Sequence, residues 1–437
     1  MSTVIYTPPA RPLQGKIQVP ASKSAAHRAI LCAALSRGSC EISRLELNDD
    51  IRATINAVRT LGTDAVYDSE KKTLRLSSGT EENQETVLLD CRESGSTLRF
   101  LIPIAAALGK PCTFTGSGRL PQRPLSVYQD LLPEHGVQLC RQSKDELPLT
   151  LRGQLQPGIF RLPGNISSQF ITGLLFALPL LPGDSRILLS SPLESKSYVT
   201  LTLQILRDFG IIICPDSNGW VIPGRQSYQA RDYAVEGDWS QAAFFLSMAA
   251  FSRERITLTG LREDSVQGDR ACMEIYCSFG LQIEQAGGLV TAKNPQTDLP
   301  FHGLHAVSID AAQIPDLVPA LAVCAAGCRG VTVIRHAERL RLKECDRLAA
   351  MAEAIGRLGG QAEETADGLK ITGAERLHGG TVRGMNDHRV VMSLAGAVLF
   401  SEEPIHVTDA WSIRKSYPDF YKDYKQLGGN ADVIDMG

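Results

Sequence analysis

Two stretches of the sequence place cationic side chains close to serines that open an apolar, alanine-rich run. In SKSAAHRAI, Lys23 lies between two serines and Arg28 follows Ser24 by four residues. In SGSTLR, Arg99 likewise follows Ser96 by about one helical turn. Serine at a helix start caps free backbone N–H groups, and the cations beside it can simply point into solvent. Alternatively, this combination of side chains binds an anion.

Two further runs begin on several polar residues in succession. GNISSQF supplies three neutral hydrogen-bonding groups, and capping alone would explain one serine but not all three. These residues are Ser167, Ser168 and Gln169. NDHRVVM places a carboxylate, an imidazole and a guanidinium side by side at the start of another apolar run. These residues are Asp387, His388 and Arg389.

Three clusters of cations lie outside these starts. Arg123 precedes a helix-opening proline in QRPL, RLKECDR holds Lys343, Glu344 and Arg347, and IRKSYPD holds Lys415. Because Lys343 and Arg347 are four residues apart, a solvated face of ion pairs is the alternative for that cluster. Arginine binds phosphate and carboxylate through paired hydrogen bonds, so a site with at least four arginines and three lysines fits substrates that carry several negative charges.

Acid–base candidates must lie beside those cations. Asp316 opens an apolar run directly after Pro315 in QIPDLVPAL, where helix capping is the alternative role. Glu344 is flanked by Lys343 and lies near Arg347. A lysine and two carboxylates could pass protons to and from a carbon or an oxygen without a metal.

The elements that must position these residues form a repeat. Six apolar runs begin on polar or capping residues, and their starts are 71 to 78 residues apart, which is too regular for unrelated helices. The runs are Ser22–Leu35, Ser94–Leu108, Ser167–Leu180, Asp238–Phe251, Asp316–Cys328 and Asp387–Phe400. They are apolar nearly all round, which is typical of buried helices.

Amphipathic segments alternate with the apolar runs, and each ends on a glycine that can cap a helix. The glycines are Gly62, Gly136, Gly210, Gly280, Gly359 and Gly428. Stretches such as RILLSS and RGVTVIRH between them are typical of strands. We therefore expect an α/β (α+β) protein of six units in two lobes of three, with an ordinary doubly wound sheet as the alternative. Helix starts carry free N–H groups and partial positive charge, so starts that share one cleft would form an anion site.

Composition excludes several classes of protein. The chain has 437 residues, of which 43% are apolar and 21% charged, with a net charge of -3, which argues against a nucleic-acid binder. Its most apolar stretch is too short to span a membrane, and the first residues do not have the pattern of a secretion signal. The 11 cysteines lack metal-binding spacing, and neither a nucleotide phosphate loop nor a dinucleotide fingerprint is found. We expect a cytoplasmic enzyme without metal or cofactor.

The motifs together resemble the family of 5-enolpyruvylshikimate-3-phosphate synthases over about residues 13–428. The pieces that carry the resemblance are SKSAAHRAI, SGSTLR, GSGRLPQRP, NISSQF, ESKSYVTLTL, EGDWSQAAFFL, IPDLVPAL, LKECDRL, NDHRVVM and RKSYPDF. The resemblance implies a two-lobed inside-out α/β barrel, with three βαβαββ repeats in each lobe and buried parallel helices aimed at an interlobe cleft. It also implies transfer of the enolpyruvyl group of phosphoenolpyruvate to the 5-hydroxyl of shikimate 3-phosphate, by addition then elimination of phosphate, in the biosynthesis of chorismate and aromatic amino acids.

The same resemblance assigns the site residues. Shikimate 3-phosphate would be bound by Lys23, Ser24, Arg28, Ser167, Ser168, Gln169, Ser195, Tyr198, Asp316 and Lys343. Phosphoenolpyruvate would be bound by Lys23, Gly95, Arg123, Gln169, Arg347, His388, Arg389 and Lys415. The catalytic residues would be Lys23, Asp316 and Glu344, with Asp316 as base toward the hydroxyl. Glu344 and Lys23 are both candidates for proton transfer at C3 and at the leaving phosphate.

The sequence departs from the common family pattern at four positions, which are His27, Glu93, Phe100 and Arg339. The nearest alternative is UDP-N-acetylglucosamine enolpyruvyl transferase, which uses a loop cysteine at a position where this chain has Gly118. Another alternative is an RNA terminal phosphate cyclase, but such an enzyme would need a nucleotide site and a basic face, and the sequence indicates neither. A purely structural repeat protein is a further alternative, but it would have no need for charged residues at buried-helix starts.

We expect residues 1–20 and 238–437 to form one lobe and residues 21–237 the other. Because site residues come from both lobes, we also expect closure when substrate binds. The expected partners are the two small-molecule substrates, and we expect a monomer.

Overall fold

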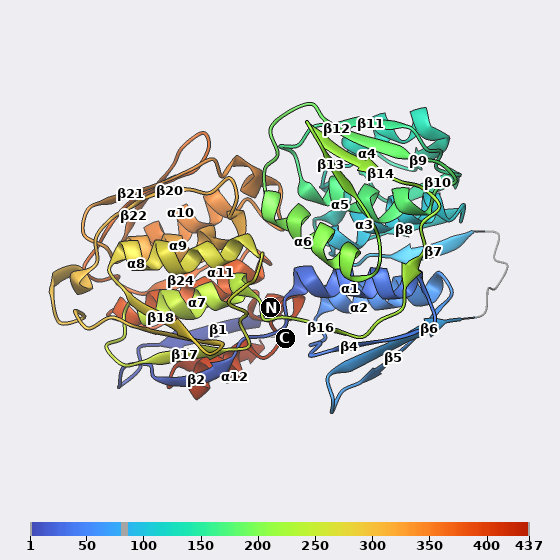
Figure 1. Cartoon of the computed structure of the whole chain (residues 1–437). Coiled ribbons are helices and arrows are strands. Elements are labelled where there is room, and N and C mark those ends of the chain that lie inside the picture. The colour runs from blue at the N-terminus through green and yellow to red at the C-terminus, as the bar shows by residue number, and fades with distance from the viewer. Residues whose placement is uncertain (1, 80–85, 436–437) are drawn as a thin grey trace. The chain divides into compact units, whose positions relative to one another are not determined.

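The computed structural model describes residues 2–79 and 86–435, and the chain forms two compact units (Figure 1). Unit 1 consists of Met1–Pro20 together with Gly237–Gly437, and unit 2 consists of Ala21–Glu236. Each unit contains helices and mixed sheets, which confirms the α/β class. Within the described ranges, no helix has both the length and the apolar character needed to cross a membrane.

The described residues of unit 2 form three apolar helices in its interior and three more polar helices toward its surface. The interior helices are α1 (Lys23–Leu35), α3 (Gly95–Ala107) and α5 (Ser168–Ala177). The others are α2 (Asp49–Thr60), α4 (Ser126–Leu131) and α6 (Lys196–Asp208).

The described part of unit 2 has three four-stranded sheets and one two-stranded sheet. In spatial order, the first sheet is β16 (Tyr233–Ala234), β4 (Ser39–Ser43), β6 (Thr73–Ser78) and β5 (Thr63–Asp68). The second is β7 (Val87–Asp90), β8 (Cys112–Thr115), β10 (Leu149–Gly153) and β9 (Val137–Arg141). The third is β11 (Ile159–Leu162), β12 (Ser185–Leu189), β14 (Gly219–Ile222) and β13 (Cys214–Asp216). The small sheet pairs β3 (Ser36–Arg37) with β15 (Tyr228–Gln229).

Unit 1 follows the same plan. Its interior helices are α7 (Trp239–Ala249), α9 (Val318–Ala326) and α11 (His388–Ala397). Its outer helices are α8 (Cys272–Phe279), α10 (Arg347–Arg357) and α12 (Phe420–Gln426). In spatial order, its first sheet is β2 (Gly15–Gln18), β17 (Ile256–Thr259), β19 (Leu289–Lys293) and β18 (Gln282–Ala286). The second is β20 (Ser308–Asp310), β21 (Val331–Arg335), β23 (Leu369–Thr372) and β22 (Gln361–Glu364). The third is β24 (Gly380–Val382), β25 (Ile405–Thr408), β1 (Ser2–Thr7) and β26 (Asn430–Asp435).

All six of these four-stranded sheets have one topology. The first strand of a repeat pairs parallel with the second, as β7 does with β8, and the connection between them contains an interior helix because a parallel pair requires a crossover. The fourth strand then lies between the second and the third in antiparallel pairing, as β10 does between β8 and β9. The repeat expected from the sequence is therefore confirmed at the level of strand order.

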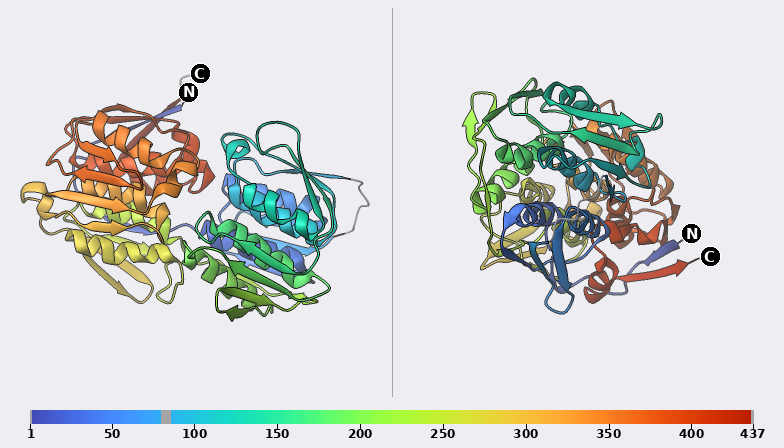
Figure 2. Two further views of the ribbon diagram at one scale, coloured as in Figure 1. Left: turned by 90° about the horizontal axis from the view of Figure 1, so that it is seen from above. Right: turned by 90° about the vertical axis from the view of Figure 1, so that its right-hand side faces the viewer.

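Three of the repeats take a strand from a distant part of the chain. β2 pairs with β17, so that Gly15–Gln18 lies beside Ile256–Thr259. β16 pairs with β4, so that a segment near residue 233 completes the repeat that begins at α1. β1 lies between β25 and β26, and Val4 faces Val407 on one side and Val433 on the other. The β1 and β26 strands, blue and red in Figure 2, are therefore neighbours although more than 400 residues separate them in sequence.

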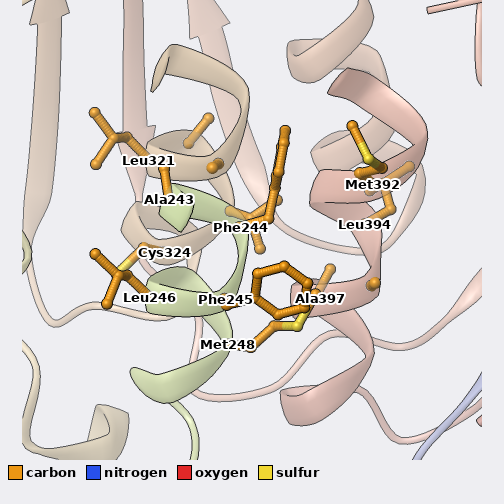
Figure 3. Packing of buried hydrophobic residues seen from close by; sticks show 14 of the residues in the cluster. Ala243, Phe244, Phe245, Leu246, Met248, Leu321, Cys324, Met392, Leu394 and Ala397 are labelled. Atoms are coloured by element: carbon orange, nitrogen blue, oxygen red, sulfur yellow. The ribbon is translucent and has the colours of Figure 1, made fainter. Parts of the chain in front are cut away.

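The core of unit 1 lies where its interior helices pack together. Figure 3 shows Phe244 and Phe245 of α7 beside Leu321 of α9 and Met392 of α11, and all four are buried. Each large apolar side chain that is fully buried stabilises the fold by about 1.5–3 kcal/mol. Alanines such as Ala243 between them leave room for this close packing.

Five of the six expected helix starts are capped by their own side chains. Ser22, Ser94, Ser167, Asp238 and Asp387 accept hydrogen bonds from backbone N–H groups in the first turn of α1, α3, α5, α7 and α11. The sixth expected start, Asp316, is not a cap. It lies inside a short 3-10 helix, Pro315–Leu317, and α9 begins after it at Val318. Its carboxylate is therefore available for other partners.

Candidate active site

In unit 1, the carboxylate of Asp316 is surrounded by cations. Arg347 Nη1 lies 3.0 Å from Asp316 Oδ1, and Arg389 Nη2 lies 3.1 Å from Oδ2. Lys343 Nζ lies 3.6 Å from Oδ1. Burial raises the pKa of Asp316, but Arg389, Lys343 and Arg347 together outweigh burial and Glu344, and hold this pKa well below its ordinary value. Asp316 is therefore a carboxylate at neutral pH.

Arg347, the first residue of α10, joins three carboxylates although its side chain is almost completely buried. Its Nε lies 2.7 Å from Asp387 Oδ2, and its Nη2 lies 2.7 Å from Glu344 Oε2. Nη1 contacts Asp316, as described above. Burial lowers the pKa of Arg347, but Asp387, Glu344 and Asp316 raise it well above its ordinary value. The guanidinium is consequently a fixed positive charge.

Arg389 connects the starts of the three interior helices of unit 1. It is the second residue of α11, and its Nη2 donates to Ser240 Oγ at the start of α7, over 2.9 Å. Its Nη1 donates to the carbonyl oxygen of Asp316, 3.1 Å away, just before α9. The chain thus brings three helix starts, whose free N–H groups favour anions, to one place in this unit.

His388 and Lys415 lie at the same helix start. His388 is 1% exposed, with Nδ1 4.0 Å from Asp387 Oδ1. Lys415 is buried, and its Nζ donates to the carbonyl oxygen of Asn386 over 2.6 Å. Asn386 has a φ of 51°, a left-handed conformation that is uncommon outside glycine. The Lys415 contact therefore holds the turn that leads into α11.

In unit 2, Arg28 is a buried cation with neutral partners. Its Nε donates to Thr202 Oγ1 over 2.8 Å, and its Nη1 to the carbonyl oxygen of Ser24 over 2.7 Å. Its Nη2 contacts the carbonyl of Tyr198 and the hydroxyl of Thr172. Burial lowers the pKa of Arg28 from 12.5 to about 10. Among the described residues, no carboxylate contacts this guanidinium, so its charge favours an anionic ligand.

Lys23, by contrast, forms an ion pair. Its Nζ lies 2.6 Å from Asp50 Oδ2 in the first turn of α2, and both side chains are partly exposed. Lys23 is the first residue of α1, so its ammonium group extends from the helix start that Ser22 caps.

Gln169 and Arg99 connect α5 to α3. Arg99 Nη1 donates to Gln169 Oε1 over 2.9 Å, and Gln169 Nε2 donates to Ser96 Oγ over 3.0 Å. Arg123 lies against Gly95, the first residue of α3, where an added Cβ would come within 2.8 Å of Arg123 Nη1. The absence of a side chain at Gly95 therefore makes room for the Arg123 guanidinium.

The remaining residues expected in unit 2 lie at the starts of α5 and α6. Ser167 caps α5, and Ser168 is its first helical residue. Ser195 precedes α6, is 3% exposed and has a φ of 52°. Tyr198 lies in the first turn of α6, where its carbonyl meets Arg28.

The two groups differ in charge. In unit 2, Lys23 pairs with the carboxylate of Asp50, whereas Arg28 contacts hydroxyl and carbonyl groups and Arg99 contacts Gln169 and the carbonyl oxygen of Pro124. In unit 1, Asp316, Glu344 and Asp387 largely balance Lys343, Arg347, Arg389 and Lys415. The first group can bind anions directly, whereas the second combines cations with carboxylates that can exchange protons.

Several residues of these groups were not expected from the sequence. Asp50 lies in LNDDIRATINAV, where the carboxylates resemble an ordinary helix start, and nothing local indicates its pairing with Lys23. Asp387 was expected only at a helix start, yet it also binds Arg347. Ser240 was not singled out at all. Among the described residues, no group of three or more His, Cys, Asp or Glu is arranged to hold a metal ion.

Two of the departures from the family pattern have clear contacts. Arg339 Nη2 donates to the carbonyl oxygen of Ala312 over 2.6 Å. The Glu93 carboxylate lies so close to Gly118 that a Cβ at that position would collide with it. Gly118 also has a φ of 58°. A cysteine at residue 118, as the alternative enzyme would require, does not fit without a shift of Glu93.

Comparison with known proteins identifies the family. Residues 8–424 match the family model for EPSP synthase (3-phosphoshikimate 1-carboxyvinyltransferase). Proteins named 3-phosphoshikimate 1-carboxyvinyltransferase from Clostridium novyi (strain NT) and Clostridioides difficile (strain 630) are each 43% identical, covering 97% of this chain and 98% of the relative.

Solved structures show the same fold. An EPSP synthase from Acinetobacter baumannii superposes with a TM-score of 0.81 at 24% identity, covering 100% of both chains. The enolpyruvyl transferase NikO from Streptomyces tendae also gives 0.81, at 19% identity, covering 99% of this chain and 98% of NikO. The chain belongs to the EPSP synthase family.

Proposed function

We propose that this chain transfers the enolpyruvyl group of phosphoenolpyruvate to the 5-hydroxyl of shikimate 3-phosphate, releasing phosphate, as a step in the biosynthesis of chorismate and aromatic amino acids. The observation that carries the proposal is the 43% identity over 97% of the chain to relatives named 3-phosphoshikimate 1-carboxyvinyltransferase. The two groups of buried cations at helix starts support it, because both substrates carry phosphate and carboxylate groups.

Shikimate 3-phosphate would be bound mainly by residues of unit 2. Arg28 has a buried charge and no carboxylate among its described partners, so an anionic group of the substrate would supply its counter-ion. The other proposed contacts from this unit are Lys23, Ser24, Ser167, Ser168, Gln169, Ser195 and Tyr198. Asp316 and Lys343 would contact the same substrate from unit 1.

Phosphoenolpyruvate would be bound by residues of both units. Those of unit 2 are Lys23, Gly95, Arg123 and Gln169, and those of unit 1 are Arg347, His388, Arg389 and Lys415. Both groups would therefore serve one pair of substrates. Arginine fits this role because its planar guanidinium can hold a phosphate or a carboxylate through two hydrogen bonds.

The reaction would begin with addition. The sugar oxygen forms a bond to C2 of the enolpyruvyl group as its proton passes to a base, and C3 gains a proton to become a methyl group. Asp316 is the proposed base. In the free protein its three cationic partners make it a weak base. Anionic substrates that bind these cations would reduce their effect on Asp316 and raise its proton affinity.

Elimination would follow, as the C2–O bond to phosphate breaks and C3 loses a proton to restore the double bond. Glu344 and Lys23 are the proposed groups for proton transfer at C3 and at the leaving phosphate. Glu344 lies 2.7 Å from Arg347, and Lys23 2.6 Å from Asp50, so each has a fixed position. The surrounding cations would stabilise charge in the tetrahedral intermediate.

We further propose that the enzyme acts in the cytoplasm as a monomer, and that it requires neither metal nor cofactor. UDP-N-acetylglucosamine is the alternative acceptor. The contact of Glu93 with Gly118 favours shikimate 3-phosphate, since the loop cysteine of the alternative enzyme has no room there.

The test is phosphate release from phosphoenolpyruvate with and without shikimate 3-phosphate, in the presence of a metal chelator. Release that requires shikimate 3-phosphate and continues under chelation supports the proposal. Release only with UDP-N-acetylglucosamine would establish the alternative, and release with neither acceptor would refute both.

A further inference from the structure

Four buried polar side chains of unit 2 form a continuous hydrogen-bonded chain across three helices. His27 Nδ1 of α1 lies 2.7 Å from Thr54 Oγ1 of α2. Thr54 Oγ1 lies 2.7 Å from Thr97 Oγ1 of α3, and Thr97 Oγ1 donates to Ser94 Oγ over 2.7 Å. All four residues are at most 1% exposed. This series of hydrogen bonds ends on Ser94, the residue that caps α3, directly before Gly95.

This hydrogen-bonded series lies inward of a second link between α1 and α2. The outer link is the ion pair of Lys23 with Asp50. Lys23 and His27 are four residues apart on α1, and Asp50 and Thr54 are four residues apart on α2, so the two links lie one turn apart on the same faces. The α1–α2 contact that holds Lys23 is therefore continued inward by His27.

The direction of the hydrogen bonds determines which nitrogen of His27 carries the proton. A threonine hydroxyl has one hydrogen, and that of Thr97 is directed to Ser94 Oγ, 2.7 Å away, or to the carbonyl oxygen of Asp50, 3.5 Å away, and in both cases not to Thr54. Thr54 must then donate to Thr97, and His27 must donate to Thr54 through Nδ1–H. His27 Nε2 is buried and has no hydrogen-bond partner among the described residues. Burial, with Lys23 and Arg28, lowers the pKa of His27 well below its ordinary value, so the ring is neutral.

We propose that His27, acting through Thr54, Thr97 and Ser94, is a positioning residue that holds Lys23 in register with the start of α3. This inference rests on the proposed function, in which Lys23 and Gly95 contact phosphoenolpyruvate. His27 itself touches no substrate. A shift of about 1 Å in a group that transfers a proton can cost 10²-fold in rate, so a polar link this close to Lys23 affects catalysis.

The first measurement does not depend on activity. In protein labelled with [15N]histidine, the ring nitrogens of His27 are identified by the signals that His27→Asn removes. We expect the tautomer with the proton on Nδ1, and no titration between pH 8 and pH 6. A proton on Nε2, or a ring that titrates in this range, would overturn the inferred direction of the chain.

The second measurement compares matched variants. His27→Leu and Thr54→Val remove the link, whereas His27→Asn keeps an N–H near Nδ1 and Thr54→Ser keeps the hydroxyl. Thr60→Val, on the exposed end of α2, is the control. We expect kcat to fall about 10-fold in the first two variants, with KM for both substrates within about 2-fold, and to stay within about 2-fold in the other three.

The double variant His27→Leu/Thr54→Val should lose no more of kcat than either single variant, because both substitutions break the same series of hydrogen bonds. Equal loss in His27→Asn and His27→Leu, or an unchanged kcat in folded Thr54→Val, would show that the chain only stabilises the fold. If His27→Leu does not fold, the nearly isosteric Thr54→Val carries the test. A wild-type protein without transferase activity would refute the proposed function, while the tautomer measurement would still decide the direction of the chain.

Discussion

Arg347 Nη1 lies 3.0 Å from Asp316 Oδ1. This contact places the proposed base in direct contact with a buried guanidinium that is proposed to bind phosphoenolpyruvate. Substrate binding and proton affinity are therefore coupled at Asp316, since any anion that attracts Arg347 weakens the contact that keeps the carboxylate ionised.

Replacement of Asp316 by asparagine should abolish turnover and preserve binding. The amide fits the same space, but it cannot accept the hydroxyl proton, so kcat should fall by about 10² to 10⁴-fold. Calorimetric titration with shikimate 3-phosphate should give a dissociation constant close to that of the wild type. The matched control is Asp298→Asn, whose side chain is 86% exposed. Loss of binding in a folded Asp316→Asn protein would instead make Asp316 mainly a ligand contact rather than the base.

We expect the Asp316 carboxylate to make the stability of the protein depend on pH, and Asp316→Asn and Asp298→Asn test this. Arg389, Lys343 and Arg347 hold the pKa of Asp316 below its ordinary value of 3.8, against the effects of burial and Glu344. The stabilisation from this group is therefore present above about pH 4 and is lost as the pH falls through the lower pKa of the folded state.

Urea unfolding from pH 6 to pH 3 measures this effect. The free energy of unfolding of Asp316→Asn should be lower than that of the wild type at pH 6, and the difference should shrink at acid pH. Asp298→Asn should show a small difference that varies little with pH. A constant gap between wild type and Asp316→Asn would contradict the assigned cause.

Gly95→Ala should weaken the use of phosphoenolpyruvate. The new methyl group would lie within 2.8 Å of Arg123 Nη1 and 2.9 Å of Arg99 Nη1, so both guanidinium groups must move. We expect KM for phosphoenolpyruvate to rise about 10-fold, the effect of losing about 1.4 kcal/mol of binding. Steady-state kinetics with each substrate varied in turn measures this.

Gly356→Ala is the control for that substitution, because nothing lies within 4 Å of a Cβ added there, inside α10. It should stabilise the protein by about 0.5–1 kcal/mol through helix propensity and leave KM unchanged. An equal KM in Gly95→Ala and wild type would show that Arg123 adjusts without cost.

Arg347→Leu should destabilise unit 1 strongly. It leaves Asp387, Asp316 and Glu344 buried or partly buried without their shared cation, which costs about 3–5 kcal/mol. The control is Arg357, which lies ten residues after Arg347 on the same helix and forms a surface ion pair with Glu353. Arg357→Leu should cost less than about 1 kcal/mol of stability. Equal losses in thermal unfolding would contradict the account of Arg347.

Local sequence signals predicted the interior helices and most of their caps. Ser22 and Asp387 are recognisable because a capping residue is followed at once by an apolar run, and the regular spacing revealed the repeat. The helix start predicted at Asp316 was wrong, because the proline before it starts a 3-10 turn and α9 begins only at Val318. The resemblance to the family supplied the assignment of substrates, which spacing alone did not contain.

Contacts between distant segments could not be predicted in this way. The ion pair of Lys23 with Asp50 and the bond of Arg389 to Ser240 join residues on different helices, and neither partner has a neighbouring residue that identifies the other. The position of β1 between β25 and β26 is of the same kind, since its short apolar run, residues 4–6, would suit many strands.

That position of β1 imposes an order on biosynthesis. The strands of unit 2 are all translated by residue 234, so this unit can complete its sheets while the ribosome is still making the rest. The β1 strand must wait for its two partners, residues 405–408 and 430–435, which follow it by about 20 to 85 s at 5 to 20 residues per second. Until β25 has emerged, the backbone N–H and C=O groups of β1 have no native partner, which is the condition under which a strand edge recruits another chain. We therefore expect nascent chains to be exposed to aggregation at β1 until its partner strands have been made.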